Sequence, residues 1–365
     1  MKTSILYEIH KSHGAVFSDT HGWEMPAHYG NAVEEHLNVR KGAGIIDLSQ
    51  RGKLRISGKD RVIFLQKILS QDINKIKPFT GAYSTLLDVK GKMLAYMCIL
   101  ADEDSFLIDL EPGLAEKVFQ ILNRFLFRED VKIDDVTEQY GLLSIQGPAS
   151  GQLLNKVCRT ETGNMQECSH SNVIVNGVNC KVEKTSFTGE DGHSIYCPSG
   201  SMTQLWNYIL SAGVDFQLKP FGLNALETLR IEAGIPLFNV DMDEHTIPVE
   251  ANLDKAISYD KGCYIGQETI ARIKFRGHVN KTLTGFLINE DVVPAKGDKV
   301  TGLIENTEHE IGIITSSCLS PSLNRPIAMG YIRILHNKPD EVIYIEANSK
   351  KISAKITNLP FYRKI

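Results

Sequence analysis

The chain has 365 residues, of which 42% are hydrophobic and 23% are charged, and its formal net charge is −4. This length exceeds the size at which one hydrophobic core keeps growing, so two or three domains are expected. The small net charge gives no overall reason to expect nucleic acid or an anionic membrane as partner. The longest apolar runs, such as residues 93–100, are far shorter than the roughly 18 residues of a membrane-spanning helix.

The cysteines indicate a reducing compartment. They have no Cys-x-x-Cys spacing, which argues against a disulfide framework, a zinc ribbon and a cluster held by four cysteines of this chain. The histidines are scattered, so we predict no metal site. Because the first residues also lack a signal-peptide core, we expect a cytoplasmic protein. The seven cysteines are Cys98, Cys158, Cys168, Cys180, Cys197, Cys263 and Cys318.

The first half of the chain predicts mixed strands and helices. A short helix is followed by a polar, aromatic loop over residues 17–29 and by a helix near residues 32–41, which ends in a Gly-x-Gly sequence. That sequence lacks the full GxGxxG pattern and a following helix, which excludes a dinucleotide site. Residues 52–137 then alternate strands with helices around a turn at residues 88–92, which is typical of an α+β subdomain.

The second half of the chain predicts further mixed helices and strands, followed by a region of strands alone. A helix begins at Ala149, a strand lies near residues 173–183, and a helix covers the region from residue 223 to Gly234. After residue 276 only short strands remain, spaced by about 8–12 residues with Gly, Asn and Pro turns. This spacing predicts a small β-barrel.

The most unusual stretch is the octapeptide at residues 261–268, Lys-Gly-Cys-Tyr-Ile-Gly-Gln-Glu. Gly262 and Gly266 allow backbone conformations that other residues avoid. Lys261 and a helix N-terminus near Gln267 would both favour the thiolate of Cys263. The pattern therefore predicts a reactive thiol, and the alternative is a buried cysteine on a turn.

This octapeptide, which ends at Glu268, resembles the signature of the YgfZ-type folate-binding proteins, relatives of the glycine cleavage T-protein (aminomethyltransferase). The T-protein branch usually reads Lys-x-Asp-Phe-x-Gly-Lys/Arg-Glu here, without a thiol. The resemblance extends over essentially the whole chain. It implies a T-protein-like α+β fold, with residues 1–279 as a folate-binding region of two interleaved α+β subdomains, one roughly at residues 52–137, and residues 280–365 as a C-terminal β-barrel.

The resemblance also implies a folate site that binds tetrahydrofolate or a derivative. The segment around Glu190 is similar to the T-protein pattern Gly-x-Thr-Gly-Glu-Asp-Gly-x-Glu-Ile, with Ser186 and Ser194 as departures. A carboxylate can accept both the 2-amino group and the ring N–H of a pterin, and Glu190 is the residue matched to that role. Arg230 is matched to the glutamate-bearing end of the folate, and Tyr83 to ring stacking.

One departure bears on the reaction. T-proteins have a Gly-Gly-x-x-Asp-Asp sequence after the position of Tyr83, and counting from this tyrosine places the acidic pair on Ala95 and Tyr96. Neither residue has a carboxylate to handle a proton. We therefore expect a tetrahydrofolate-binding protein that supports iron–sulfur cluster assembly or repair in client proteins. The alternatives are an aminomethyltransferase or other one-carbon transferase acting on a lipoyl-bound or free substrate, and a fold kept only for protein contacts.

Overall fold

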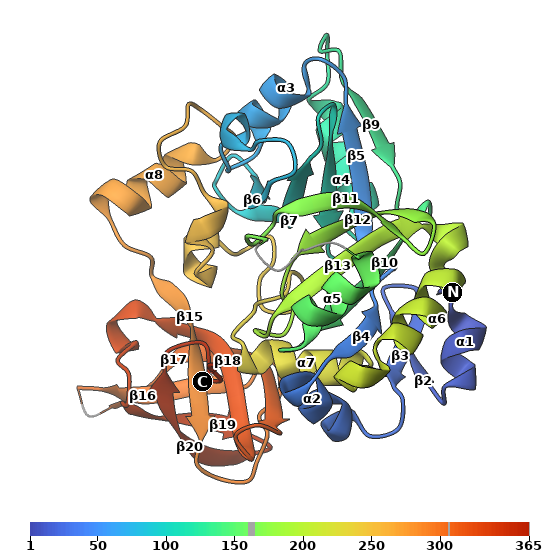
Figure 1. Cartoon of the computed structure of the whole chain (residues 1–365). Helices are drawn as coiled ribbons and strands as arrows, with labels where there is room; N and C mark the ends of the chain where they lie inside the picture. Colours follow the sequence, from blue (N-terminus) through green and yellow to red (C-terminus); the bar gives the residue numbers. More distant parts are fainter. Residues whose placement is uncertain (160–164, 306, 365) are drawn as a thin grey trace. The chain divides into compact units, whose positions relative to one another are not determined.

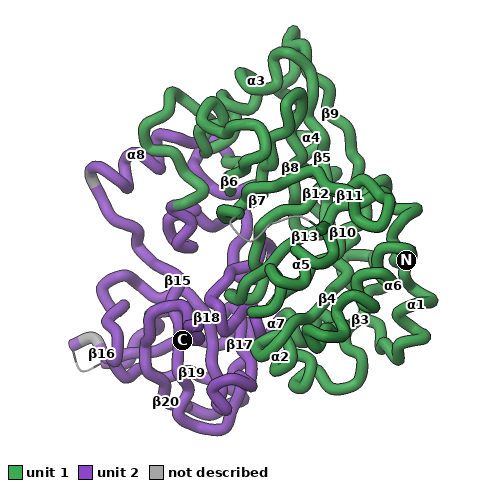
Figure 2. The backbone as a smooth tube through the Cα atoms, in the orientation of Figure 1, with its two compact units in different colours: residues 1–87, 94–226, 255–265 green, residues 88–93, 227–254, 266–365 purple. Residues whose placement is uncertain are grey.

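The computed structural model describes residues 1–159, 165–305 and 307–364. These residues form two compact units, and each unit is built from more than one segment of the chain (Figure 2). Unit 1 comprises residues 1–87, 94–226 and 255–265. Unit 2 comprises residues 88–93, 227–254 and 266–365, so it contains the predicted barrel together with segments that precede the predicted boundary at residue 280.

Residues 52–137 contain a five-stranded sheet, in the strand order β6-β7-β8-β5-β9. Its strands are β5 (Gly52–Ser57), β6 (Gly81–Leu87), β7 (Met93–Ala101), β8 (Ser105–Leu110) and β9 (Lys132–Asp135), and its helices are α3 (Arg61–Ile68) and α4 (Ala115–Arg124). Strands β5, β8 and β7 are antiparallel neighbours in which Lys53, Asp109 and Cys98 are successive register partners. These three residues therefore share one face of the sheet.

A six-stranded sheet forms the rest of the large core of unit 1, in the order β11-β12-β13-β10-β4-β14. Its strands are β4 (Gly44–Asp47), β10 (Tyr140–Gln146), β11 (His170–Val175), β12 (Val178–Lys184), β13 (Gly192–Pro198) and β14 (Lys219–Pro220). Helices α5 (Ser150–Cys158) and α6 (Met202–Ala212) cover one face of this sheet (Figure 1). Leu153, Leu205 and Trp206 pack there against Ile145 and Ile195, all fully buried.

The N-terminal region differs from the prediction in one place. Residues 17–29 are an antiparallel pair, β2 (Val16–Thr20) and β3 (Trp23–His28), and not a loop. His21 and Gly22 make the turn with positive φ values of 52° and 81°. Since His-Gly is not one of the usual hairpin signals, this turn was not expected. The neighbouring elements are β1 (Lys2–Thr3), α1 (Tyr7–Ser12) and α2 (Ala32–Lys41), and α2 confirms the predicted helix.

The strand predicted near residues 173–183 is in fact a hairpin of β11 and β12. Asn176 and Gly177 connect the two strands with φ values of 47° and 81°. Both central residues of a two-residue turn need positive φ in this geometry, and Asn-Gly is the sequence that adopts it most readily. The prediction of one continuous strand was wrong because it did not take this turn signal into account.

Unit 2 contains a closed barrel in the order β15-β18-β17-β16-β19-β20, which confirms the predicted C-terminal architecture (Figure 1). Its strands are β15 (Lys281–Ile288), β16 (Lys299–Ile304), β17 (Thr307–Ser320), β18 (Arg325–Arg333), β19 (Val342–Ala347) and β20 (Lys350–Thr357). Alternate residues of β19 are buried, which places Ile343 and Ile345 inside the barrel beside Phe286. Cys318 is buried in its strand, as predicted.

The remaining elements are helices. Helix α7 (Leu223–Glu232) begins in unit 1 and continues into unit 2, and α8 (Gln267–Arg276) lies in unit 2. Short 3-10 helices are η1 (Ile73–Lys75), η2 (Ser199–Ser201), η3 (Val214–Phe216), η4 (Pro248–Ala251), η5 (Asp254–Ala256) and η6 (Ile334–His336). Among the described helices we find no segment with the length and hydropathy of a membrane span.

Candidate functional site

Glu190 lies in the turn between β12 and β13, and its side chain is almost fully buried. Its Oε1 accepts a hydrogen bond of 3.1 Å from Nη1 of Arg40 on α2, and the exposed fractions of the two side chains are 1% and 4%. The same guanidinium Nη1 donates to the carbonyl of Thr188 at 2.9 Å. The carboxylate therefore fixes the turn to α2, and a direct contact between Glu190 and folate stays a prediction.

Gln146, on β10, holds the same turn from the other side. Its Oε1 accepts from the backbone N–H of Phe187 at 3.0 Å and from Oγ1 of Thr188 at 3.2 Å. The ring of Phe187 in turn lies 5.1 Å from the guanidinium of Arg51. These contacts give the turn a defined shape that the sequence pattern alone does not supply.

Tyr83 lies at the start of β6, beside Tyr96 of β7. The two rings are stacked, with centroids 5.5 Å apart and an interplanar angle of 17°. Both side chains are partly exposed, whereas Ala95 is fully buried. Burial of the hydroxyl groups raises the pKa of both tyrosines well above the usual value. The pair offers a neutral aromatic surface, which a planar heterocycle can stack on.

Arg230 belongs to unit 2, and all five of its N–H groups have acceptors among the described residues. Nε and Nη2 donate to the carboxylate of Glu227, Nη1 donates to Asp241 at 2.6 Å and to the carbonyl of Ile235 at 3.3 Å, and Nη2 also donates to Ser316 at 2.7 Å. Its side chain is 2% exposed. A guanidinium has five donors, so a folate contact would require one of these bonds to be exchanged.

Cys263 is exposed, and the other six cysteines are buried. The loop containing it is anchored by Lys261, whose Nζ donates to the carbonyls of Leu69 and Gln71, both at 2.7 Å. Desolvation lowers the pKa of Lys261 to about 8, although Asp72 opposes that shift. The ammonium also lies 5.1 Å from the centroid of the Tyr264 ring. Lys261 thus has a clear structural role in holding the loop.

The two glycines of the motif behave differently. Gly266 has φ 82° and is the N-cap of α8, which begins at Gln267 as predicted, with Glu268 in its first turn. Gly262 does not adopt a positive φ, and an added Cβ would meet nothing within 4 Å. The expectation that Gly262 supplies a special backbone conformation is therefore wrong.

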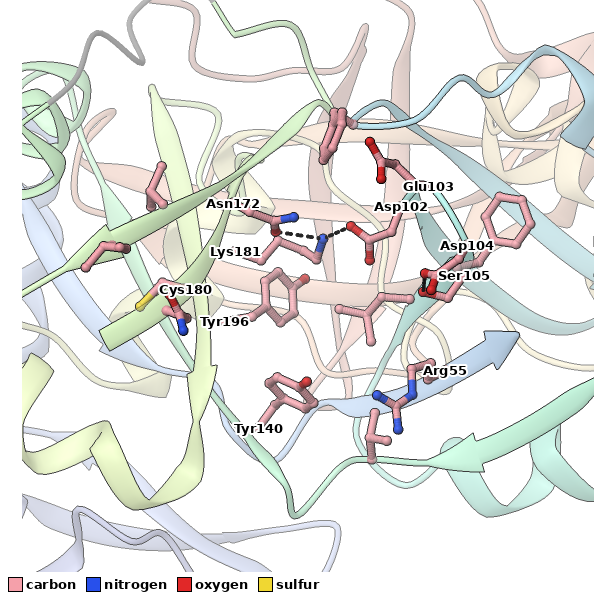
Figure 3. A pocket seen from close by; sticks show the side chains of 17 residues that line it. Arg55, Asp102, Glu103, Asp104, Ser105, Tyr140, Asn172, Cys180, Lys181 and Tyr196 are labelled. Atoms are coloured by element: carbon pink, nitrogen blue, oxygen red, sulfur yellow. Dashed lines mark hydrogen bonds and ion pairs between the residues drawn. The ribbon is translucent and has the colours of Figure 1, made fainter. Parts of the chain in front are cut away.

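Unit 1 also contains a pocket of about 650 Å³ where the hairpin of β7 and β8 approaches β11, β12 and β13 (Figure 3). Lys181 lies on its wall and bonds to Asp102 and Asn172. Tyr196 and Tyr140 line the part nearest β13 and β10. Glu190, Tyr83 and Cys263 are not among the residues that line this pocket.

Sequence reasoning missed a buried polar layer between the two sheets of unit 1. Arg51 and Asp109 form a bidentate ion pair there, with Nε to Oδ2 at 2.9 Å. Glu183, on β12, is the register partner of Ser194, the position at which the T-protein pattern has a glutamate. The alternation along β12 places Glu183 on the same face as Asn179 and Lys181, and only the fold shows that Glu183 is buried there.

Comparison with known proteins identifies the family of both parts of the chain. The family described as the GCVT N-terminal domain matches residues 6–261, and the glycine cleavage T-protein C-terminal barrel domain matches residues 281–363.

Full-length relatives agree with these matches. An aminomethyltransferase from Halothermothrix orenii is 30% identical over 99% of this chain and 100% of its own length. One from Geobacillus sp. is 32% identical over 100% of this chain and 99% of its own length. The crystal structure of the glycine cleavage system aminomethyltransferase T from Bartonella henselae, at 27% identity, covers 99% of this chain and 98% of its own, with a TM-score of 0.89. The chain therefore belongs to the glycine cleavage T-protein family.

Proposed function

We propose that this protein binds tetrahydrofolate and acts as a one-carbon transferase of the aminomethyltransferase type. The observation that carries this proposal is the full-length similarity to aminomethyltransferases, at 30% identity over 99% of the chain. Both domain families match, so the similarity is not confined to one part of the fold. The similarity supports the aminomethyltransferase alternative.

The residues of unit 1 fit a reduced folate in one respect. The partly exposed rings of Tyr83 and Tyr96 form an uncharged aromatic surface. A pterin ring can stack on such a surface. Glu190 and Arg230 instead have buried partners of their own. We propose that these two residues act mainly by fixing their surroundings and that Tyr83 makes a direct contact.

The proposed contact can be tested by calorimetric titration of tetrahydrofolate into Tyr83→Ala and Tyr83→Phe variants. Removal of the ring should weaken binding by about 0.5–1.5 kcal/mol, the usual range for an aromatic pair, while Tyr83→Phe keeps the ring and should bind almost as well as the parent. Equal affinity of Tyr83→Ala and the parent would exclude the contact.

The transfer reaction is tested by reconstituting glycine cleavage with purified partner proteins and tetrahydrofolate. Turnover that depends on both the chain and the folate is the expected result. If the parent protein binds tetrahydrofolate but gives no glycine cleavage turnover in this assay, the transferase proposal is contradicted.

A specific observation favours a second function, the support of iron–sulfur cluster assembly or repair in client proteins. Cys263 is the exposed thiol among seven cysteines, and it lies in the octapeptide typical of YgfZ-type proteins. An accessible thiol in a well-anchored loop is suited to redox or transfer chemistry. The clients of such a function would be other proteins' cluster sites.

The Cys263→Ser variant distinguishes the two proposed functions. If the thiol serves cluster maintenance, this variant should fail to restore iron–sulfur enzyme activity in cells lacking the protein, while folate binding is unchanged. If aminomethyl transfer is the function, Cys263→Ser should retain the turnover of the parent. Brief iodoacetamide treatment with mass-spectrometric mapping should label Cys263 before Cys98 or Cys318, both of which are buried.

A further inference from the structure

Three potential metal ligands meet inside the polar layer of unit 1. Cys98 comes from β7, Glu183 from β12, and Cys168 from the segment just before β11. The two sulfur atoms and a carboxylate oxygen all lie within 4.8 Å of one another. Cys98 Sγ donates to Glu183 Oε1 at 3.3 Å. The cluster is assembled from residues far apart in the sequence, so it is a product of the fold.

Glu183 is a buried carboxylate that lacks an ion-pair partner within the described part of the chain. It is 2% exposed, and it accepts hydrogen bonds from two neutral donors, the thiol of Cys98 and the hydroxyl of Tyr196. Arg51, the nearby cation, forms its ion pairs with Asp109 and Glu111 instead. Buried carboxylates are normally paired with a cation or coordinate a metal.

We propose that Cys98, Cys168 and Glu183 bind one divalent metal ion of the zinc class. Two thiolates and a carboxylate are a donor set that Zn²⁺ accepts, and hard ions such as Mg²⁺ and Ca²⁺ do not favour sulfur. Three protein ligands leave the fourth tetrahedral position for water or another small ligand.

The spacing of the ligand atoms matches this ion. With a Zn–S distance of about 2.3 Å and a Zn–O distance of about 2.1 Å, tetrahedral geometry separates the ligand atoms by roughly 3.6–3.8 Å. The Cys98–Glu183 separation of 3.3 Å and the 4.8 Å limit for the whole cluster bracket those values. Shifts of up to about 1 Å would therefore bring the three ligand atoms to the separations of a tetrahedral zinc site.

The surroundings provide an outer partner for Glu183. Tyr196 donates from its hydroxyl to Glu183 Oε2 at 2.8 Å, which orients the carboxylate as outer partners of metal ligands do. Tyr196 also lines the pocket of about 650 Å³ shown in Figure 3. One side chain thus links the cluster to a solvent-accessible pocket. Cys168 itself has a positive φ of 61°, an uncommon backbone conformation for this residue type.

The test loads the full chain with Co²⁺ or Zn²⁺ after treatment with a chelator and a reductant. All measurements use a Cys263→Ser background, because that exposed thiol would also take up metal. We expect about one metal per chain by elemental analysis. Co²⁺ should give a thiolate-to-cobalt charge-transfer band together with the intense visible bands of a tetrahedral site. This spectrum is recorded without any substitution in the cluster, so it tests the proposal even if the cluster variants do not fold.

The variants Cys98→Ser, Cys168→Ser and Glu183→Gln should each lower metal affinity at least about tenfold, as substitutions even of outer partners do at known sites. Cys197→Ser is the matched control, because Cys197 is likewise a buried cysteine of unit 1 but lies outside the cluster. It should keep full stoichiometry and the charge-transfer band. Absence of that band in the parent, or full retention of metal by the Cys98→Ser/Cys168→Ser double variant, would overturn the proposal.

Discussion

At the scale of single residues, two buried charges of the candidate site, Glu190 and Arg230, have ion-pair partners within their own unit. Glu190 pairs with Arg40, and Arg230 pairs with Asp241 and Glu227. Removal of one member of a buried pair leaves an uncompensated charge, which costs more than the pair itself contributes. Substitutions at these positions will therefore lower stability whatever they do to ligand binding, so folding must be checked first.

Arg230 gives the clearest case. Arg230→Met should lower the free energy of unfolding by about 3–5 kcal/mol, because it leaves the buried Asp241 without its cation. Urea unfolding followed by circular dichroism measures this change. Glu227→Gln is the control, since the Glu227 side chain is 44% exposed and its loss should cost no more than about 1 kcal/mol. Equal effects of the two variants would contradict the structural role assigned to Arg230.

His193 makes stability depend on pH. It is fully buried on β13, bonded to Ser150 at 2.7 Å, and desolvation together with the charge of Lys184 lowers the pKa of His193 to about 4. The unfolded chain, with a histidine pKa near 6.5, binds the proton first as the pH falls. This contribution to stability is therefore present above pH 6.5 and is lost as the pH falls towards 4.

The expected size of this effect is about 2 kcal/mol between pH 7 and pH 5. Urea midpoints at the two pH values measure it in the parent and in His193→Gln. The variant lacks the titrating group, so its stability should change less over this interval. An identical pH dependence of parent and variant would show that His193 titrates normally in the folded protein.

At the scale of elements, turn geometry decides which connections tolerate substitution. Gly58 joins β5 to the α3 region with φ 101°, and an added Cβ would lie 2.2 Å from the carbonyl oxygen of Asp130. Gly58→Ala should therefore destabilise the protein by about 1–3 kcal/mol. Gly200→Ala is the control, because its Cβ would meet nothing within 4 Å, and it should leave the thermal midpoint nearly unchanged. A thermal midpoint equal to the parent's in Gly58→Ala would argue against this turn geometry.

Comparison of the predicted and observed elements shows which parts of the fold could be predicted from the sequence. The helix at residues 32–41 and the turn at residues 88–92 were predictable, because capping and turn residues act over a few positions. The hairpin at His21–Gly22 was missed because His-Gly is not a usual turn signal, whereas the Asn-Gly signal at residues 176–177 was present in the sequence and was overlooked. Turn geometry was thus the weakest part of the prediction.

The candidate sites show a second limit. The sequence indicated Glu190 and Cys263, but it could not show that Glu190 pairs with an arginine 150 positions earlier in the chain. Nor could it assemble Cys98 with Glu183, which are 85 positions apart. Spacing rules for metal sites rely on ligands that are close in sequence, and this cluster has none of the usual spacings.

At the scale of the whole molecule, family membership and local chemistry point to related but different conclusions. The chain matches aminomethyltransferases over its full length and the T-protein C-terminal barrel family at residues 281–363, while Ala95 and Tyr96 carry no carboxylate. The exposed Cys263 and the buried cluster of Cys98, Cys168 and Glu183 place cysteine side chains in two distinct surroundings. Folate binding is the property that both proposed functions share.

The most direct measurement is therefore a calorimetric titration of tetrahydrofolate into the reduced, full-length protein, with the thermal midpoint recorded alongside. We predict a saturable heat with about one folate per chain and a rise of the midpoint with ligand concentration, as expected for a ligand that binds only the folded state. No heat and no shift of the midpoint at millimolar tetrahydrofolate would contradict the proposal that this member of the T-protein family works with folate.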